Sequence, residues 1–502
     1  MNEEAPYDYV IAGGGTAGWM AAAGLARFAP PGTRIALVES DAIGTVGVGE
    51  ATIPQIHLWL NALGLDEREF LIKTKASFKL GIAFDGWLRE GHSYMHAFGQ
   101  VGRAHGLLPF QHYWLRAKAA GFAKPLAAYS LNEVAARNLR MAKGQPGALP
   151  YAYHFDAGLY AQHLRAFAEM RGVVRIEGTI GDVVCDGESG DIAALLLDGG
   201  RRVAGKFFMD CSGFRALLIE GALGAGFDDW SHYLPCDRAM AVACDSGGEF
   251  TPYTRSIARK AGWQWRIPLQ HRIGNGMVFS SAHLSEDEAA ATLLANLDGA
   301  PQGDPRPIRF TTGKRKEHWK NNCLALGLAA GFMEPLESTS IHLVQSAVSR
   351  FLSVLPGTTG TQATRNWFNS QADFEWQRIR DFLVLHYHAN QREGEPFWDD
   401  VRHMALPDTL VAKLDLWRAT GFIHREHEEL FTEVGWFQVL AGQGVAAESY
   451  NPMADSLSEA ELRLMLDQTE AAIANQTRPM QGHIQFLQNY ASGPSPRVEV
   501  PA

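Results

Sequence analysis

YDYVIAGGGTAG, residues Tyr7 to Gly18, decides the fold of this 502-residue chain. The β-prone, mostly apolar run Tyr7 to Ala12 predicts a strand, and the alanine-rich run Trp19 to Phe28 predicts a helix. Between them stand the three glycines of the pattern Gly13-x-Gly15-x-x-Gly18. Strand, glycine turn and helix in this order begin a dinucleotide-binding unit, in which small residues let the backbone approach a pyrophosphate.

A second strand and an acidic residue complete this unit. Arg34 to Val38 is apolar and ends at Glu39, 21 residues after Gly18 (39 minus 18), which is the spacing of an acid that binds ribose. The position of the motif at the start of the chain favours FAD over NAD. So does a second flavoprotein-like segment, Asp210 to Arg215, which follows a strand-like stretch at 206–209.

Composition excludes several other classes of protein. With 46% hydrophobic and 20% charged residues the chain is typical of a globular protein, and a net charge of -10 disfavours nucleic acid and anionic membranes as partners. The five cysteines form no Cys-x-x-Cys pair, so we expect neither a disulfide framework nor a zinc site. The acidic amino terminus does not resemble a secretory signal, and we expect a cytoplasmic protein without a membrane span.

We therefore expect an α/β fold: an FAD-binding, Rossmann-like domain of the glutathione-reductase or monooxygenase type, with a β-rich insertion and a mainly helical carboxyl-terminal region. The FAD-binding lobe is expected at 1–355, with inserted β-rich segments on the substrate side at roughly 80–170 and 225–310. A mainly helical substrate-binding region, 356–502, packs on this lobe. Its helical periodicity is found at 371–388 and 458–474, and the second of these runs opens with a Ser458 and Glu461 capping box.

The heptad Gly262-Trp-Gln-Trp-Arg-Ile-Pro268 is the most informative stretch for function. On an extended segment the indoles of Trp263 and Trp265 point to the same side and can close off one space together. Taken alone, such a pair is usually packing. Together with the glycine fingerprint, however, this chain resembles the flavin-dependent halogenases, in particular the tryptophan-halogenase branch, from Tyr9 to about Gly442.

Further motifs carry the resemblance. The loop Val46-Gly-Val-Gly-Glu50 lies along the flavin in that family, the segment from Ser77 carries the family's catalytic lysine at Lys79, and the segment from Gly327 carries its catalytic glutamate at Glu337. The halide is implied to bind backbone N–H groups, here those of Thr339 and Ser340. The implied FAD contacts are Gly13, Gly15, Ala17, Gly18, Glu39, Ser40, Ile43, Val46, Val48, Ala51, Ile180, Leu328 and Ile341.

The resemblance also implies a reaction. FADH2 and O2 give a flavin C4a-hydroperoxide, which chloride or bromide attacks to form hypohalous acid. Trp263 and Trp265 form the barrier that keeps the aromatic substrate from this oxidant, because direct contact leads to hydroxylation. Lys79 holds the hypohalous acid beside the substrate ring, and Glu337 stabilises the ring cation and removes its proton.

The substrate residues implied by the resemblance are His96 and Phe98, which stack on an indole, with Leu430 and Phe431 on the opposite side. Tryptophan enzymes carry a tyrosine pair that grips the amino-acid backbone, whereas Ala419 to Ile423 contains no tyrosine. We expect an indole or another electron-rich arene without a free amino-acid head group, or a larger tryptophan-derived or peptide compound.

Two other functions stay open at this point. With a single dinucleotide fingerprint, the halogenase takes FADH2 from a separate NAD(P)H-dependent flavin reductase, whereas a single-component FAD-dependent aromatic hydroxylase oxidises NAD(P)H itself. A flavoprotein that binds a ligand without turnover is the third interpretation.

A homodimer is compatible with the sequence. We expect no metal, because His386-x-His388 and His424-x-x-His427 lack a third ligand at suitable spacing.

Overall fold

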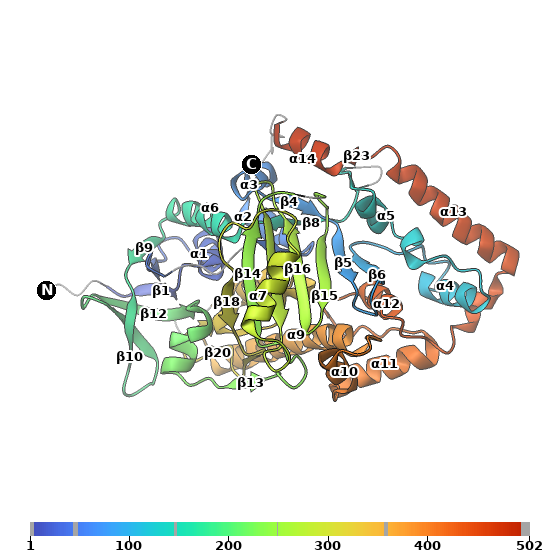
Figure 1. Cartoon of the computed structure of the whole chain (residues 1–502). Helices are drawn as coiled ribbons and strands as arrows, with labels where there is room; N and C mark the ends of the chain where they lie inside the picture. The colour runs from blue at the N-terminus through green and yellow to red at the C-terminus, as the bar shows by residue number, and fades with distance from the viewer. Residues whose placement is uncertain (1–4, 44–48, 145–147, 248, 356–359, 493–502) are drawn as a thin grey trace.

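The computed structural model describes residues 5–43, 49–144, 148–247, 249–355 and 360–492. The predicted flavin contacts Val46 and Val48 lie outside these ranges. Figure 1 shows two large sheets side by side, with the parallel sheet near the amino terminus and the carboxyl-terminal helices on the far side of the second sheet. No helix among these residues is long and apolar enough to cross a membrane.

The first sheet, of eight strands, has a parallel centre in which β1 lies between β12 and β2. Strand β1 and the following helix α1 cover the predicted strand and helix, so the first unit of the fold is confirmed. An antiparallel hairpin extends this sheet on one side. The strands are β1 (Tyr7–Ala12), β2 (Ile35–Glu39), β9 (Val174–Glu177), β10 (Ile180–Cys185), β11 (Ile192–Leu197), β12 (Arg202–Asp210), β20 (Trp319–Lys320) and β21 (Cys323–Ala325).

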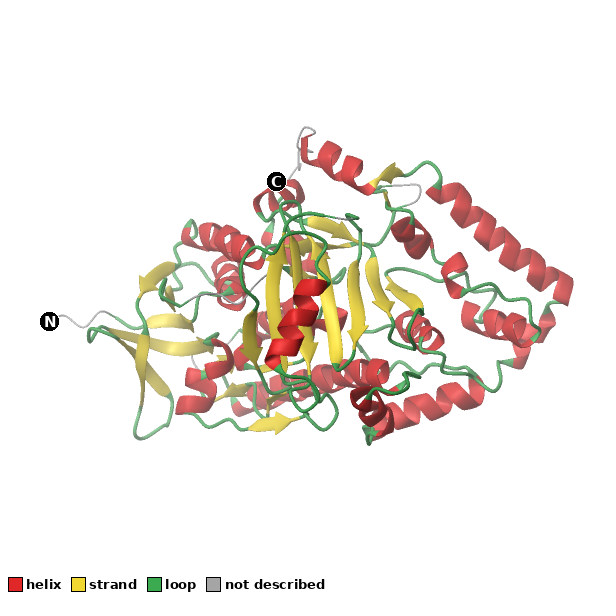
Figure 2. Cartoon of the chain, in the orientation of Figure 1, coloured by secondary structure: helices red, strands yellow, loops and turns green. Residues whose placement is uncertain are grey.

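The second sheet, of seven strands, stands at the centre of Figure 2 and is antiparallel except where β15 pairs with β5. It contains the heptad as β16, and it ends at β6. Its order is β18-β14-β17-β16-β15-β5-β6. The strands are β5 (Gly81–Asp85), β6 (Ser93–Ala97), β14 (Arg238–Cys244), β15 (Thr254–Arg259), β16 (Gly262–Pro268), β17 (Ile273–Phe279) and β18 (Arg306–Arg309).

Three small sheets complete the strands. One of them carries Lys79 on β4, opposite Ala152 of β8. Their members are β3 (Glu50–Ala51), β8 (Ala152–Phe155) and β4 (Ser77–Lys79); β13 (Phe227–Asp229), β19 (Gly313–Arg315) and β22 (Gly331–Phe332); β23 (Gln481–Gly482) and β7 (Arg140–Met141).

Helices cover both large sheets, and α1 packs on α6 and α8 beside the parallel strands. In Figure 1 α9 runs beneath the second sheet, and α10 and α11 continue beyond it. The helices are α1 (Thr16–Phe28), α2 (Ile56–Leu63), α3 (Glu67–Lys73), α4 (Phe110–Ala119), α5 (Leu131–Arg137), α6 (Ala157–Glu169), α7 (Glu286–Ala295), α8 (Ser340–Ser353), α9 (Gln362–His388), α10 (Pro396–His403), α11 (Asp408–Thr420), α12 (Glu433–Gly442), α13 (Glu459–Thr477) and α14 (His483–Ser492).

Two expectations need correction. The segment 80–170 is not β-rich: after β5 and β6 it forms α4, α5 and α6, because buried residues such as Tyr160, Leu164 and Phe167 recur at helical spacing. Helix α9 begins nine residues before the expected 371, since Thr361 and Thr364 cap each other's backbone there. The Ser458 and Glu461 capping box at the start of α13 is confirmed.

Candidate active site

The glycine turn between β1 and α1 is a cradle that side chains would fill. A Cβ on Gly13, where φ is +113°, would lie 2.3 Å from the carbonyl oxygen of Cys211, and a Cβ on Gly18 would lie 1.9 Å from that of Gly13. A Cβ on Gly15 would meet no atom within 4 Å. Gly13 and Gly18 therefore permit close packing of the chain on itself, whereas Gly15 leaves open space above the start of α1.

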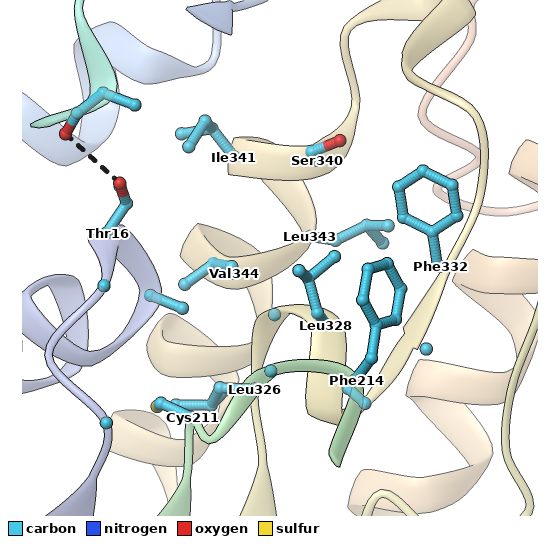
Figure 3. Close-up of a pocket in the computed structure, with 18 of the residues that line it drawn as sticks. Thr16, Cys211, Phe214, Leu326, Leu328, Phe332, Ser340, Ile341, Leu343 and Val344 are labelled. Carbon is cyan, nitrogen blue, oxygen red and sulfur yellow. Dashed lines mark hydrogen bonds between the residues drawn. The ribbon is translucent and has the colours of Figure 1, made fainter. Parts of the chain in front are cut away.

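This open space belongs to a cavity of about 470 Å³ at the carboxyl ends of β1, β2 and β12. Figure 3 shows Leu328 and Ile341 in its wall beside Cys211, Phe214 and Phe332. Gly18 lies behind the turn and does not face the cavity. The predicted FAD contacts that line it are Gly13, Gly15, Ala17, Glu39, Ser40, Ile43, Ala51, Ile180, Leu328 and Ile341.

Glu39 ends β2 at the rim of the cavity, as the spacing from the glycines predicts. Its Oε1 accepts hydrogen bonds from Arg175 Nε and, at 3.5 Å, from Arg165 Nη1. The two arginines hold the carboxylate in place beside the glycine turn. An adenine dinucleotide such as FAD fits this cavity. The glycine turn and the uncapped first turn of α1 suit its pyrophosphate, the acid at the end of β2 suits its ribose, and most of the walls are apolar.

Trp263 and Trp265 lie on one face of β16, with ring centroids 6.1 Å apart. Trp265 lines the cavity, whereas Trp263 is 1% exposed behind it. The Trp263 indole N–H donates to Glu334 at 2.7 Å, and the same carboxyl oxygen accepts a hydrogen bond from Tyr387 on α9. Burial raises the pKa of Glu334 to about 7, although these two hydrogen bonds act in the opposite direction. The tryptophan pair is thus fixed from behind by a buried carboxyl group.

Lys79 is completely buried, at 0% exposed. Its Nζ donates to the carbonyl oxygen of Thr52 at 2.9 Å and to Ser338 Oγ at 2.7 Å. Burial lowers the pKa of Lys79 to about 7, while the nearby Glu337 carboxylate acts to raise it. Both contacts use N–H groups, so an ammonium at this place keeps a third N–H for a ligand.

Glu337 ends a short 3₁₀ turn, and Ser338 follows it in the left-handed region with φ at +60°. The two carboxylate oxygens meet two imidazoles: Oε2 lies 2.8 Å from His96 Nδ1, and Oε1 lies 2.8 Å from His386 Nε2. Burial by itself raises the pKa of Glu337, but attraction to His96 and the hydrogen bonds from His386 and His96 outweigh it and hold the pKa at about 2. The group is therefore a carboxylate at neutral pH.

The residues predicted to bind substrate come together beside this pair. His96, the last but one residue of β6, lies near the Phe431 ring, with centroids 6.0 Å apart, and Lys79 Nζ lies 5.4 Å from the centroid of Phe98. The Phe431 ring stacks on Phe382 of α9 at 3.9 Å. Leu430 is partly buried next to it.

The two sites meet at Ser338. A second site next to the cavity consists of six side chains that do not line the cavity. They are Lys79, His96, Phe98, Glu337, Leu430 and Phe431. Ser338 lines the cavity and also accepts the hydrogen bond from Lys79. Of the predicted halide residues, Ser340 lines the cavity and Thr339 is buried at the start of α8.

Helix α12 clamps the strand that carries His96. The side-chain amide of Gln438 accepts from the Ala97 N–H at 3.0 Å and donates to the Ala97 carbonyl at 3.0 Å. A Cβ on Gly435 would lie 2.9 Å from His96 Nε2, and a Cβ on Gly442 would lie 2.3 Å from the Tyr94 ring. Only glycine at these two places lets the helix lie so close to β6.

Several partners in the site were not predicted from the sequence. Thr52 and Ser338 bind Lys79, and Glu334 binds Trp263. His386, which belongs to the His-x-His pair considered above as a metal site, binds Glu337 instead. Within the described ranges, no group of three or more histidine, cysteine or acidic side chains is arranged to hold a metal ion.

Comparisons with known proteins agree with this geometry. The family model "Tryptophan halogenase" matches residues 8–459. Tryptophan 6-halogenase SttH of Streptomyces toxytricini is 34% identical over 446 residues, which are 83% of this chain and 85% of that protein. The structure is similar to Xcc4156, a flavin-dependent halogenase from Xanthomonas campestris, with a TM-score of 0.95 and 46% identity over 98% of this chain and 100% of that one.

It is also similar to BrvH, a flavin-dependent halogenase from Brevundimonas sp. BAL3, with a TM-score of 0.92 and 43% identity over 97% of this chain and 99% of that one. The FAD-binding α/β fold expected from the glycine fingerprint is thereby confirmed. With a cofactor cavity on one side of Ser338 and a buried lysine and carboxylate on the other, this chain belongs to the tryptophan halogenase family and is a flavin-dependent halogenase.

Proposed function

We propose that this enzyme uses FADH2, O2 and chloride or bromide to halogenate indole or another electron-rich arene without a free amino-acid head group. One observation carries the proposal: Ser338 lines the dinucleotide cavity and accepts a hydrogen bond from the buried Lys79, next in sequence to Glu337. An oxidant released at the cavity therefore has a short way to a cation and a carboxylate that solvent does not reach.

FAD would be held by the glycine turn, by Glu39 at its ribose and by the apolar walls that include Leu328 and Ile341. In its reduced form and with O2, the bound flavin supplies the two-electron oxidation that converts halide into hypohalous acid. The halide would bind the N–H groups of Thr339 and Ser340, where α8 begins without a side-chain cap and presents the positive end of its dipole.

The tryptophan pair keeps the arene away from the cofactor. Trp265 faces the cavity, and Trp263 is fixed by Glu334, so two large rings stand at one wall. A barrier of this kind prevents the hydroxylation that direct contact between flavin and arene would allow.

Lys79 and Glu337 perform the transfer. The third N–H of the Lys79 ammonium holds hypohalous acid beside the arene. The reaction is faster because the distance and orientation of the two reactants are fixed. As the halogen of hypohalous acid adds to the ring, its bond to oxygen breaks and the hydroxyl leaves as water with a proton from the Lys79 ammonium, while the Glu337 carboxylate stabilises the ring cation and then accepts the ring proton. With a pKa of about 2, the group acts mainly through its charge, because a ring cation is a strong acid and needs only a weak base.

Two acidic side chains shortly before Phe431 in sequence already have basic partners, which supports a substrate without a zwitterionic head group. Glu429, just before Leu430, accepts from Lys413 Nζ at 2.9 Å, and Glu426 accepts from Arg378 Nε at 3.0 Å. Glu337 is occupied by two imidazoles.

Flavin-dependent halogenases need a separate flavin reductase, and we propose an NAD(P)H-dependent one that delivers FADH2 by diffusion or transient contact. Cytoplasmic location and a homodimer stay predictions from the sequence.

A product screen tests the proposal. The purified enzyme is mixed with a flavin reductase, NADH, FAD and either halide, and a panel of indoles, tryptophan derivatives and phenols is analysed by mass spectrometry. We expect halogenated products, with indole and tryptophan derivatives turned over at comparable rates. A strict requirement for tryptophan contradicts the proposed substrate class.

The same screen separates the other two functions. An oxygenated product formed without halide, with NADH oxidised by the enzyme alone, indicates an aromatic hydroxylase. Bound flavin with no halogenated product from any arene indicates a protein that binds without turnover.

A further inference from the structure

His386 lies on α9 directly behind Glu337 and is fully buried. Its Nε2 lies 2.8 Å from Glu337 Oε1, and its Nδ1 lies 2.8 Å from the Tyr94 hydroxyl. The imidazole also stacks on Phe84, with centroids 4.4 Å apart and planes 18° from parallel. The ring is therefore fixed by two hydrogen bonds and by a stacked neighbour, and it has no room to turn.

Charge fixes the direction of both hydrogen bonds. The Glu337 carboxylate can only accept, so His386 Nε2 must carry a hydrogen. Burial lowers the pKa of His386, although Glu337 acts to raise it, and this favours an imidazole whose Nδ1 is an acceptor. Burial raises the pKa of Tyr94 well above its usual value, so its hydroxyl keeps its proton and donates to Nδ1. The result is a chain from Tyr94 through His386 to Glu337 in which each member has one role.

The same strand holds both ends of the carboxylate. Tyr94 and His96 are two residues apart on β6, so both point to the same side, where His96 binds Oε2 and Tyr94 supports the imidazole on Oε1. His96 is also a predicted contact of the arene, whereas His386 and Tyr94 lie behind the carboxylate. A carboxylate bound at both oxygens cannot rotate about its terminal bond.

We propose that Tyr94 and His386 are positioning residues, which orient the Glu337 carboxylate for the ring cation without contacting the arene. The inference rests on the proposed function, since it requires Glu337 to act on the arene.

The test uses the full enzyme with reductase, NADH, FAD, bromide and indole. His386→Leu removes the donor to Glu337, His386→Gln can replace it with an amide N–H, and Tyr94→Phe removes only the supporting hydroxyl. We expect kcat to fall at least about tenfold in His386→Leu with KM for indole nearly unchanged, to recover most of this loss in His386→Gln, and to fall about threefold in Tyr94→Phe.

The pH profile gives a readout that a packing defect does not move. The titratable groups around Glu337 are Lys79 on β4, Tyr94 and His96 on β6, and His386 on α9. Burial raises the pKa of Glu337, and the hydrogen bond from His386 lowers it. In His386→Leu this hydrogen bond is lost, so the pKa of Glu337 rises and the acid limb of kcat moves to higher pH. His386→Gln should return the limb toward its original position.

Matched controls make each outcome decisive. Tyr113 on α4 is a buried tyrosine outside the site, with its hydroxyl on the carbonyl of His105, so Tyr113→Phe should leave kcat unchanged. Wild-type kcat and acid limb in His386→Leu, or equal losses in His386→Leu and His386→Gln, overturn the proposal. If His386→Leu does not fold, Tyr94→Phe decides: a kcat equal to that of Tyr113→Phe overturns it. A wild-type enzyme that halogenates no arene contradicts the proposed function instead.

Discussion

The dinucleotide cavity and the Lys79 site lie on either side of Ser338 and are built in opposite ways. The glycine turn at the cavity owes its shape to residues that are close in sequence, Gly13, Gly15 and Gly18, while the other walls come from segments as distant as Phe214, Leu328 and Trp376. The second site consists of ionisable side chains from β4, β6, α9 and the turn before α8. The first part of the cofactor site is thus specified locally, whereas the reaction site depends throughout on how distant elements pack.

The largest effect that separates the two sites is expected from Lys79→Ala. Transfer to the arene should fall by about 10³-fold, because the oxidant is no longer held, while flavin binding stays unchanged. Halogenated product is measured by mass spectrometry, and escaped hypohalous acid is measured with a trapping reagent. The exposed Lys316 offers a control as Lys316→Ala. Undiminished halogenation would remove Lys79 from the reaction.

Glu337→Gln should come next, with a loss of at least about 10²-fold in kcat and little change in FAD affinity. The amide keeps the volume of the side chain but cannot stabilise a cation or accept a proton. Single-turnover rates with preformed FADH2 measure this without a contribution from the reductase. A rate close to wild type would show that the carboxylate is dispensable.

The pH dependence sharpens the comparison, because the charge of Lys79 changes near neutral pH. With a pKa of about 7, Lys79 is an ammonium below pH 7 and an amine above it. The third N–H is then lost, so the share of oxidant delivered to the arene should fall by about tenfold per pH unit above pH 7. The ratio of product to trapped hypohalous acid between pH 6 and 9 measures it. A ratio that rises across pH 7 would assign the reaction to the neutral amine.

Two glycines test the cavity with smaller effects on the rest of the molecule. Gly13→Ala places a Cβ against the Cys211 carbonyl at a positive φ. It should lower the free energy of unfolding by about 2 kcal/mol and also weaken FAD binding. Gly15→Ala meets no protein atom, so we expect an unchanged Tm but weaker FAD binding. Thermal unfolding without flavin and fluorescence titration with FAD separate these outcomes. Equal Tm losses in both variants would contradict the distinction.

The sequence could predict the glycine turn and the acid of the cavity because these features are local. Tyr7–Ala12, the glycines and Glu39 follow each other at fixed spacings, and each spacing has a steric reason. Lys79, Glu337 and the tryptophan pair could be located only through motifs that resemble a known family. The helices within 80–170 were missed, although their buried residues recur at helical spacing.

The partners of the reaction site could not be predicted. Tyr94 and His386 are 292 residues apart, and Lys79 and Ser338 are 259 apart. No periodicity or composition connects such positions, because their contact depends on how α9 and the turn before α8 pack against β6 and β4. The His386-x-His388 spacing suggests only a pair of metal ligands. It does not indicate that the partner of His386 is a single distant carboxylate, Glu337.

The Gln438 amide helps to fix the register of β6 relative to the elements around it. Because successive side chains of a strand alternate between faces, a slip by one residue would turn His96 away from Glu337 and bring a neighbour in its place. The Gln438 amide accepts through Oε1 and donates through Nε2, and the Ala97 backbone supplies a partner for each. A single side chain of α12 thus fixes the register of the last strand of the sheet, and it keeps the His96 imidazole on the face that meets Glu337.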